Sequence, residues 1–302
     1  MMSRGLWRRM IQYWLYKSGL FIIHLVPRGW AYRFAEFAAR LHFRFSSTDR
    51  EAVIHNLRQI TGRKDDLTKE ALKVFLNFGR YLTDFFLMYK MVDHDFVRNE
   101  VSMIGRPHLD AVAAHGKGGI ILTAHVGNWE MGAAVMNKLG FPVTVIALPH
   151  KNPKVNLLFN RQREAHGATV VPANMAVRRC LGALRQGKFI ALLGDRDFGT
   201  FGEPLDFFGR KTLIPKGAAF FSCRTGAPII PSFLVPQGNG RFTMNFEEPI
   251  FPPCGAGDAG VLALMERYVA VIEKKIKEDP TQWLMFREFG VEFENLYSHS
   301  RP

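Results

Sequence analysis

Residues 119–130 read GIILTAHVGNWE, and this stretch alone predicts a buried strand followed by a site. The apolar run IIL is typical of a strand inside a sheet, and it leads to His125. Gly127 and Asn128 then suit a turn, and Glu130 falls on what should be the first turn of a helix. Open α/β sheets place their sites at the carboxyl ends of parallel strands. The stretch therefore predicts an α/β protein with a site at His125.

The pattern continues outward as alternating strands and helices. Alternation of this kind predicts a mostly parallel central sheet flanked by helices. The chain up to about residue 90 reads as helices instead, the alternation begins after residue 100, and a long glycine-containing loop is expected after residue 197. No internal repeat or linker interrupts the pattern, so we predict a single domain over 31–302 after an N-terminal portion at 1–30. The expected strands are 119–124, 143–148, 169–172, 189–194, 228–235 and 241–247, and the expected helices are 41–60, 68–91, 129–139, 153–166, 175–186, 216–225 and 259–278.

The N-terminal portion combines positive charge with apolar side chains. Residues 1–50 contain nine Arg and Lys against two acids, and the segment 11–26 between them is rich in Trp, Leu, Phe and Ile. Polar residues interrupt this segment, so it falls short of the roughly 20 apolar residues of a spanning helix. It also lacks the small-residue cleavage site of a secretory signal. We predict a membrane-associating helix within 1–30 that lies in the interface, with a helix of the domain core as the alternative.

His125 and Glu130 have the chemistry of a base and the group that orients it. A carboxylate that accepts from one imidazole nitrogen fixes the tautomer and raises the basicity of the other nitrogen. Five positions along one helix turn about 140° around the axis, so the two side chains can meet only if His125 lies on the turn. The chain has no G-x-S-x-G motif, and the nucleophile is therefore expected to be the substrate. A hydrogen-bonded strand-end histidine beside a solvated glutamate is the alternative.

Further candidate residues follow other predicted elements. Asp195, Arg196 and Asp197 come directly after the strand at 189–194, so they should share the sheet edge of His125, unless they form only a charged turn. Two arginines two positions apart, at 161 and 163, point to different faces of their helix. At most one of them should face the site. Arg210 and Lys211 in the later loop could contact a phosphate of the substrate, because arginine binds phosphate in a forked geometry.

Several motifs in the same order resemble one known family. GKGGIILTAHVGNWEMG at 116–132, GDRDF at 194–198, PLDFFGRKTLIPKGAA at 204–219 and QWLMFREF at 282–289 resemble the bacterial lipid A biosynthesis lauroyl/myristoyl acyltransferases. These belong to the lysophospholipid acyltransferase superfamily with its H-x4-D/E motif, and mycobacterial mannoside acyltransferases look similar. The resemblance covers nearly the whole chain.

The resemblance implies an enzyme at the cytoplasmic face of the bacterial inner membrane. Its acceptor would be a lipid A precursor, a lysophospholipid or a related glycolipid, and its donor an acyl thioester of acyl carrier protein or coenzyme A. An acidic residue near the histidine implies that Asp195 or Arg196 organises the donor phosphate or the His–Glu pair. Family members carry an arginine near Arg163, which favours it over its neighbour at 161. The segment of Arg210 and Lys211 is implied to lie on the acceptor and acyl-chain side.

Charge and cysteine content agree with such partners. The 302-residue chain has a net charge of +13, and its sequence pI is about 9.9, so anionic partners are expected. Nucleic acid is not favoured because no recognition motif appears. Three cysteines without a CxxC spacing predict reduced thiols of a cytoplasmic protein.

These observations together predict an O-acyltransferase that needs no metal and no cofactor beyond the acyl thioester. His125 would be the general base and Glu130 its orienting partner. Backbone N–H groups around Gly127 and Asn128 would stabilise the oxyanion. Two alternatives stay open. One is a metal-dependent hydrolase with His125, Glu130, Asp195 and Asp197 as ligands, and the other is a membrane-binding protein without turnover.

Overall fold

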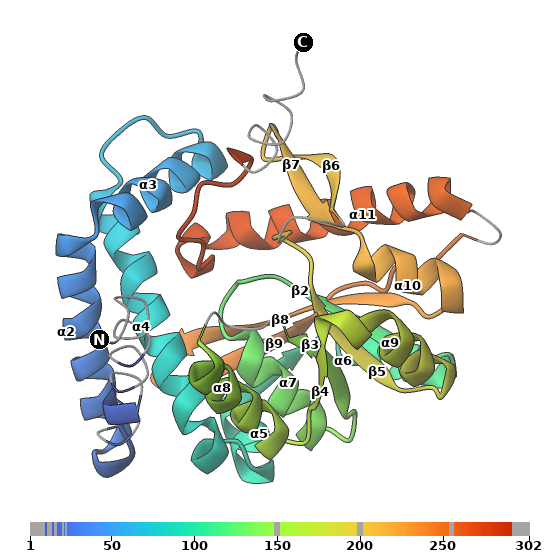
Figure 1. The fold of residues 1–302 in the computed structure, drawn as a ribbon, viewed down its shortest axis with the longest axis horizontal. Helices are drawn as coiled ribbons and strands as arrows, with labels where there is room; N and C mark the ends of the chain where they lie inside the picture. Colours follow the sequence, from blue (N-terminus) through green and yellow to red (C-terminus); the bar gives the residue numbers. More distant parts are fainter. Residues whose placement is uncertain are drawn as a thin grey trace, which may run out of the picture.

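The described residues of the computed structural model form one seven-stranded sheet and a separate two-stranded hairpin. They are 10, 14, 17–19, 21 and 23–291 except 148–151, 198–201 and 254–256. The sheet has the order β1-β9-β8-β2-β5-β3-β4 and is parallel except where β8 pairs with β9 (Figure 1). The strands are β1 Val101–Ile104, β2 Gly119–Thr123, β3 Val143–Ala147, β4 Thr169–Pro172, β5 Phe189–Leu193, β8 Ile229–Gly238 and β9 Arg241–Phe246.

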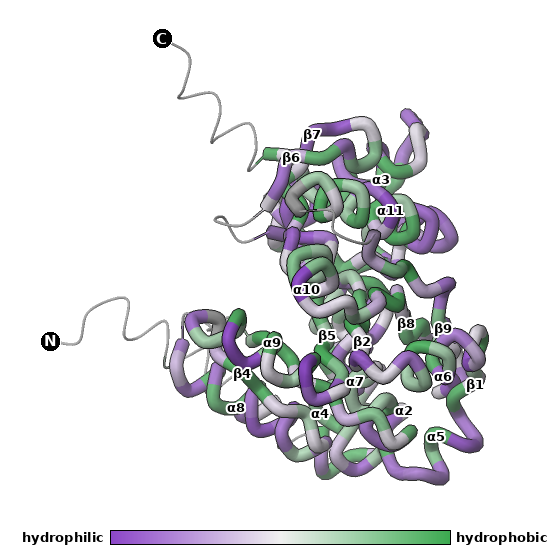
Figure 2. Tube along the Cα trace, turned by 90° about the vertical axis from the view of Figure 1, so that its right-hand side faces the viewer, coloured by the Kyte–Doolittle hydropathy of each residue, from purple (hydrophilic) through white to green (hydrophobic). Residues whose placement is uncertain are grey.

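Helices cover both faces of this sheet. Every residue of β2 is buried, and successive side chains of a strand point to opposite faces. Ile120 and Leu122 accordingly pack with α9, α10 and α11, whereas Ile121 packs with α4, α5, α6, α7 and α8. Figure 2 shows the hydrophobic strands β2, β5 and β8 between these layers. The helices are α4 Thr68–Met91, α5 His94–Glu100, α6 Arg106–Ala114, α7 Trp129–Lys138, α8 Pro153–Ala165, α9 Ala176–Arg185, α10 Gly217–Thr225 and α11 Gly257–Glu278.

The predicted strands and the predicted helices from residue 68 onward are confirmed, two expectations are wrong, and three short elements were not predicted. The expected loop after residue 197 contains an antiparallel hairpin, β6 Gly202–Phe207 and β7 Arg210–Pro215, whose turn holds Phe208 and Gly209 at positive φ. The short elements α5, β1 and α6 were not predicted. The helix expected at 41–60 is two helices, α2 Arg28–Phe45 and α3 Ser47–Thr61, because the chain turns at Ser46, whose Oγ donates to Asp49.

Helix α2 packs closely against α4 through small side chains. Ala31 and Ala39 of α2 are buried, and Gly79 of α4 leaves little room for a Cβ, which would lie 3.0 Å from the carbonyl oxygen of Ala35. A buried polar cluster joins the same helices. The carboxylate of Asp84 in α4 accepts hydrogen bonds from Tyr32 and Arg28 of α2. Small residues and buried polar contacts together fix the position of α2 on the body of the protein.

Most of the predicted N-terminal segment 1–30 lies outside the described residues. Of its described part, Trp14, Phe21 and Leu25 are exposed, whereas Ile23 is buried against α2 and α4. Along the chain as far as the structure describes it, no helix combines the length and hydropathy that a membrane span requires.

Candidate active site

A tightly held turn between β2 and α7 presents His125. Gly127 donates its backbone N–H to the carbonyl of Gln282 (3.0 Å), and Asn128 donates to that of Leu234 (2.8 Å). The carbonyl of His125 accepts from the N–H of Leu284 at 2.8 Å. The Asn128 side chain caps α7 by accepting from Met131 N at 3.1 Å, as an N-cap residue does. The turn is therefore bonded to β8 and to the segment after α11.

Gly127 is the residue that allows this close approach, and its substitution should destabilise the folded protein. Its φ is +63°, and a Cβ there would lie 2.3 Å from the backbone oxygen of Leu234. We expect Gly127→Ala to lower the free energy of unfolding by more than about 1 kcal/mol, because positive φ and a backbone clash act together. Chemical denaturation measures this. Gly182→Ala is the matched control, because Gly182 lies within α9 with nothing within 4 Å of its Cβ position. It should leave stability unchanged or raised. Equal stabilities of the two variants would contradict the expected strain.

The imidazole of His125 is held by Asp195, which follows β5. Nδ1 of His125 lies 3.0 Å from Oδ1 of Asp195, and the backbone N–H of His125 donates to Oδ2 at 3.0 Å. Oδ2 also accepts from Nε1 of Trp283 at 2.8 Å. The Asp195 side chain is fully buried, while that of His125 is 12% exposed. Because the carboxylate accepts at Nδ1, the proton lies there, and Nε2 has a lone pair available for a substrate proton.

The carboxyl group of Asp195 is kept ionised by these donors. Burial alone would raise its pKa, but the positive charge that His125 has when protonated and the hydrogen bonds from His125 and Trp283 hold the pKa below its usual value. An ionised carboxylate beside Nδ1 both orients the ring and stabilises the imidazolium that forms when Nε2 takes a proton.

Glu130 has a different partner, which corrects the predicted His–Glu pair. Its carboxylate is bound by the guanidinium of Arg163 in α8, with Nε 2.9 Å from Oε2 and Nη2 on Oε1. Both side chains are mostly buried, and Asn160 accepts from Nη1 of Arg163 at 3.2 Å. Burial alone would lower the pKa of Arg163, but the hydrogen bond and charge of Glu130 raise it, so the pair is ionic. The group that orients His125 is therefore Asp195.

The expected oxyanion donors are also corrected. The N–H groups of Gly127 and Asn128 are used in the bonds to Gln282 and Leu234 and are not free for a substrate. The next two N–H groups, those of Trp129 and Glu130, begin α7 and have no acceptor among the described residues. The first N–H groups of a helix point out of its amino end, where negative charge is stabilised.

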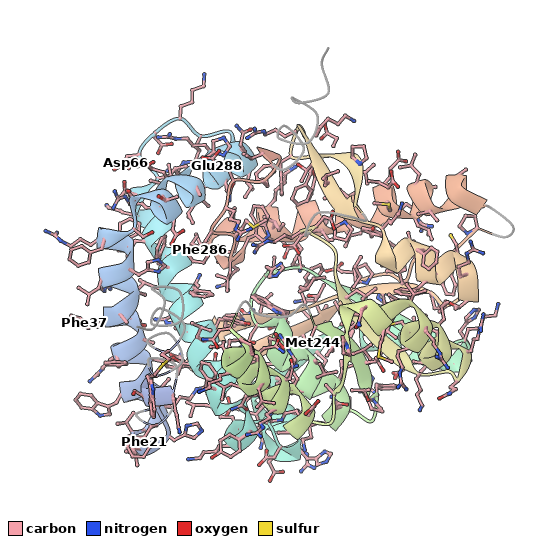
Figure 3. The ribbon with its side chains drawn as sticks, viewed as in Figure 1. Phe21, Phe37, Asp66, Met244, Phe286 and Glu288 are labelled. Atoms are coloured by element: carbon pink, nitrogen blue, oxygen red, sulfur yellow. The ribbon has the colours of Figure 1, made fainter. Side chains whose placement is uncertain are left out.

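Two clefts lie near the catalytic turn, and Trp129 and Arg196 line both. The first, of about 870 Å³, contains His125 and is bounded by α3, α4 and the segment 284–291. Figure 3 labels Phe286 and Glu288 of this segment beside α3 and α4. The second, of about 400 Å³, contains Glu130 and Arg163 at one end. Its other walls are mainly apolar and come from the carboxyl ends of β2, β3 and β5 and from α10.

The structure brings together most of the predicted site residues. Arg196 lies at the junction of the clefts, and Asp197 lines the second cleft and accepts from the N–H of Gly202 at 3.1 Å. Arg210 instead lies 3.2 Å from Nε2 of His55, and neither Arg210 nor Lys211 lines either cleft. Trp283 was not predicted as a site residue, because its contact with Asp195 spans 88 positions and no local pattern marks it.

The ligand set of the predicted metal-dependent hydrolase does not converge. Glu130 is bound by Arg163, while Asp195 is bound by His125 and Trp283. Among the residues that the structure describes, no three His, Cys, Asp or Glu side chains are grouped as metal ligands would be.

Known proteins with similar sequences are acyltransferases. The sequence model of the family described as bacterial lipid A biosynthesis acyltransferase matches residues 3–289. A phosphatidylinositol mannoside acyltransferase of Mycobacterium tuberculosis is 26% identical over 285 residues, which are 91% of this chain and 87% of that protein. A lipid A biosynthesis acyltransferase of Haemophilus influenzae is 28% identical over 158 residues, 51% of this chain and 48% of that protein.

A crystal structure is also similar. It is that of the 1-acyl-sn-glycerophosphate acyltransferase PlsC from Thermotoga maritima, which covers 89% of this chain and 98% of its own at a TM-score of 0.40 and 14% identity. The match to the family model extends over nearly the whole chain and includes the turn of His125, Asp195 and Trp283. The chain belongs to the bacterial lipid A biosynthesis acyltransferase family and is a transferase enzyme.

Proposed function

We propose that this enzyme moves a fatty acyl group from a thioester to a hydroxyl of a membrane lipid or glycolipid, with His125 as general base. The observation that carries the proposal is the buried Asp195 carboxylate on Nδ1 of His125, with Nε2 left for the substrate. A fixed imidazole of this kind acts on a proton that a substrate hydroxyl brings to it. No nucleophilic side chain of the protein is required.

The proposed reaction moves one proton from the acceptor hydroxyl to Nε2 of His125 and then to the leaving thiolate. Nε2 takes the proton of the acceptor hydroxyl while its oxygen attacks the thioester carbonyl carbon. The negative charge on the carbonyl oxygen is stabilised by the free N–H groups of Trp129 and Glu130 and by the Arg196 guanidinium. The carbon–sulfur bond then breaks, and the imidazolium returns its proton to the leaving thiolate. An ester and a free thiol result, and the enzyme is unchanged.

The two clefts suit different parts of the substrates. The cleft of about 400 Å³ beside Glu130 and Arg163 has mainly apolar walls, including Ile146 and Leu192, which fit a hydrocarbon chain. The larger cleft contains His125 and mixes aromatic with charged side chains, including Arg287, which fits a polar acceptor. The Glu130–Arg163 pair would then fix the junction between acyl chain and thioester.

The acceptor class is best found by product analysis. Purified enzyme is incubated with acyl carrier protein and coenzyme A thioesters and with lysophospholipid, mannosylated phosphatidylinositol or a lipid A precursor, and products are read by lipid mass spectrometry. We expect a new ester on one of these acceptors, formed equally well with a metal chelator present. Release of free fatty acid alone would favour a hydrolase, and no turnover with any thioester would favour the non-catalytic alternative.

The outer face of α2 supports contact with a lipid surface. Five large apolar side chains lie one helical turn apart along it: Trp30, Phe34, Phe37, Leu41 and Phe45, which are 62%, 48%, 59%, 42% and 78% exposed. Figure 3 labels Phe37 on the side of α2 away from the sheet. Exposed arginines flank the stripe at 33, 40 and 44, and the Arg33 guanidinium lies 5.1 Å from the Trp30 ring. Basic residues beside an aromatic face are typical of interfacial helices.

We propose that this stripe docks on the anionic cytoplasmic leaflet of the inner membrane. A buried Phe or Leu contributes roughly 1.5–3 kcal/mol, while an arginine near an anionic surface contributes about 1 kcal/mol. The apolar side chains should therefore dominate, so high salt should loosen binding without releasing the protein, since salt screens only the charges.

Removing two rings of the stripe tests this surface. We expect Phe34→Ser/Phe37→Ser to weaken binding to phosphatidylglycerol-containing phosphatidylcholine vesicles about a hundredfold, since half-insertion of both rings corresponds to about 3 kcal/mol. Flotation measures the bound fraction. Phe251→Ser/Leu262→Ser removes two apolar side chains that are 45% and 44% exposed outside α2, and it should bind like the wild type. Equal binding by both variants, or complete release of wild type by salt, would place the lipid contact elsewhere.

A further inference from the structure

A third cavity, of about 620 Å³, borders the catalytic turn 125–128 and has no part in the proposed reaction. Gly127 and Asn128 line it, whereas His125 and Trp129, on either side of them in the chain, line the larger of the two substrate clefts. Its other walls come from α2, α4, the β8–β9 turn and the segment 279–282. Within the described part of the chain, Tyr81 is the one residue that this cavity shares with either substrate cleft. The cavity is therefore a separate site.

The charged side chains of the cavity wall have a net positive charge. Four are basic and two are acidic: Arg28, Lys73, Arg80, Arg241, Asp84 and Asp279. Nζ of Lys73 lies 3.5 Å from Asp279, and the Lys73 side chain is 56% exposed. Nε of Arg241 lies 3.7 Å from Glu100, which is outside the wall, and the Arg241 side chain is 72% exposed. Exposed pairs of this kind contribute little energy, so both cations are available to an anion in the cavity.

Two buried amide side chains of the wall have unused hydrogen-bonding groups. Gln282 is 8% exposed, and its side chain makes no hydrogen bond with any residue that the structure describes. Asn128 is 1% exposed, and its Oδ1 is used in capping α7. At most one of the two N–H groups on Nδ2 of Asn128 reaches Asp84, so the other has no acceptor among the described residues. Buried polar groups are normally hydrogen-bonded, and these two amides therefore indicate a ligand with acceptor atoms.

The β8–β9 turn holds a guanidinium against the same wall. Gly238, Asn239 and Gly240 all have positive φ, and a Cβ at Gly240 would lie 3.0 Å from Nη1 of Arg28. Nε of Arg28 donates to Tyr32, and Nη2 donates to Asp84. Nη1 has no hydrogen-bond acceptor among the described residues, so this cation also has N–H groups left for a ligand.

We propose that this cavity binds a phosphate group, either free or in the head group of a lipid, and that the bound phosphate steadies the catalytic turn. Arginine, lysine and amide N–H groups are the donors that bind phosphate oxygens in proteins. Asn128 belongs to the turn, and Gln282 belongs to the segment whose backbone carbonyl holds the N–H of Gly127. A ligand that bonds to both amides joins these two segments. The effect on turnover rests on the proposed acyl transfer by His125, whereas the binding of phosphate does not.

Calorimetric titration of the full-length enzyme with inorganic phosphate, at an ionic strength held constant with sodium chloride, tests the site. We expect saturable binding, and a Tm raised by about 5 °C or more at about a hundredfold excess of phosphate over Kd. Lys73→Ala/Arg241→Ala should raise Kd about tenfold or more, because it removes two charge-assisted contacts. Lys64→Ala/Arg98→Ala makes the same change in net charge at exposed positions outside the cavity, and it should bind like the wild type.

A soluble short-chain lipid distinguishes the two sources of the phosphate. Dihexanoyl phosphatidic acid is titrated beside inorganic phosphate, with dihexanoyl phosphatidylcholine as the zwitterionic control. Binding of the phosphatidic acid about tenfold tighter than that of phosphate would support a lipid head group, and equal affinities would support the free anion. Equal binding of phosphatidylcholine and phosphatidic acid would overturn the proposed recognition of phosphate, because only the acyl chains and the glycerol would then matter.

Turnover tests the link to the catalytic turn. With both substrates saturating, we expect phosphate to raise kcat of the wild type and of Lys64→Ala/Arg98→Ala about fivefold, the lower end of typical coupling between two sites. Lys73→Ala/Arg241→Ala should match the wild type without phosphate and should not respond to it.

Other results would overturn the proposal in recognisable ways. Equal Kd values for the two double variants, or no saturable binding, would refute the phosphate site. A higher KM for the acceptor with kcat unchanged would make the cavity part of the acceptor cleft, and binding without any change in kcat would refute the effect on the turn. Phosphate binding that depends on Lys73 and Arg241, in a protein that transfers no acyl group, would refute the proposed function and leave this site standing.

Discussion

Replacing His125 with alanine should reduce kcat at least a hundredfold while the fold persists. General-base catalysis contributes about 10²–10⁴-fold, and among the described residues His125 is the one imidazole that Asp195 holds. Asp195 would keep its hydrogen bonds from Trp283 and from the backbone of residue 125, so it would not become an unbonded charge. Steady-state kinetics and thermal unfolding on the same preparation measure both effects.

A second substitution separates catalysis from packing. His125→Asn places an amide N–H near the position of Nδ1, where it can donate to Asp195, but it supplies no base. We expect it to be as inactive as His125→Ala and closer to wild type in stability. Near-wild-type turnover by a folded variant of either kind would show that another group accepts the proton.

Asp195→Asn should have the second large effect, because an amide reverses the hydrogen bond at Nδ1. The asparagine N–H would donate to Nδ1 and leave the proton on Nε2, so the nitrogen that faces the substrate would lose its lone pair. An analogous change in a serine-protease triad lowers kcat about 10⁴-fold, and we expect a loss of about 10³-fold here. The double variant with His125→Ala should be little worse than His125→Ala alone, because the two residues act as a unit.

Glu130→Gln is the matched comparison, since it also turns a buried carboxylate into an amide. It weakens the ion pair with Arg163 but leaves the tautomer of His125 unchanged. We expect a smaller loss of kcat than for Asp195→Asn. The opposite order would restore Glu130 as the orienting group.

The pH dependence of stability tests independently whether the pKa of Asp195 is lowered in the folded protein. Its pKa is lowered in the folded protein, so between the folded and unfolded pKa values the unfolded chain binds more protons, and stability rises with pH. The stabilising contribution should be complete above the ordinary carboxyl range, near pH 4, and should disappear as pH falls through the lowered pKa. The stability difference between wild type and Asp195→Asn, measured by urea denaturation, should therefore shrink on acidification.

The sequence identified the positions of the main strands and of His125, but not the partner of the imidazole. The apolar run before His125 and the capping residue Asn128 are local signals, and the structure follows them. The choice between Glu130 and Asp195 is not local. It depends on β5 lying beside β2, which brings together residues 70 positions apart, and on Arg163 reaching Glu130 across 33 positions. The spacing along the chain favoured Glu130, which is close to His125 in sequence. The order of the strands instead places Asp195 beside the imidazole.

The hairpin and the stripe of α2 show two other limits. The glycines and aromatic residues in 202–215 suggested a loop. The segment is a hairpin instead, and β6 and β7 pair with each other outside the main sheet, so the alternating pattern of the sheet strands does not mark them. The spacing of Trp30, Phe34, Phe37, Leu41 and Phe45 is visible in the sequence. Which face of that helix is buried depends on Gly79 in α4, and the smaller alanine face is the one that fits against it.

The close packing of α2 against α4 also bears on how far His125 lies from the membrane surface. No flexible connection separates the aromatic stripe from the catalytic turn: α2 is bonded through Arg28 and Tyr32 to Asp84, and α4 is bonded through Asn77 to the carbonyl of Thr281, next to Gln282, which holds Gly127. On the proposed lipid contact, the depth to which the rings of α2 enter the leaflet fixes the height of His125 above it. The enzyme would then distinguish acceptors by how far their hydroxyl stands from the acyl chains, before any contact with the head group is made.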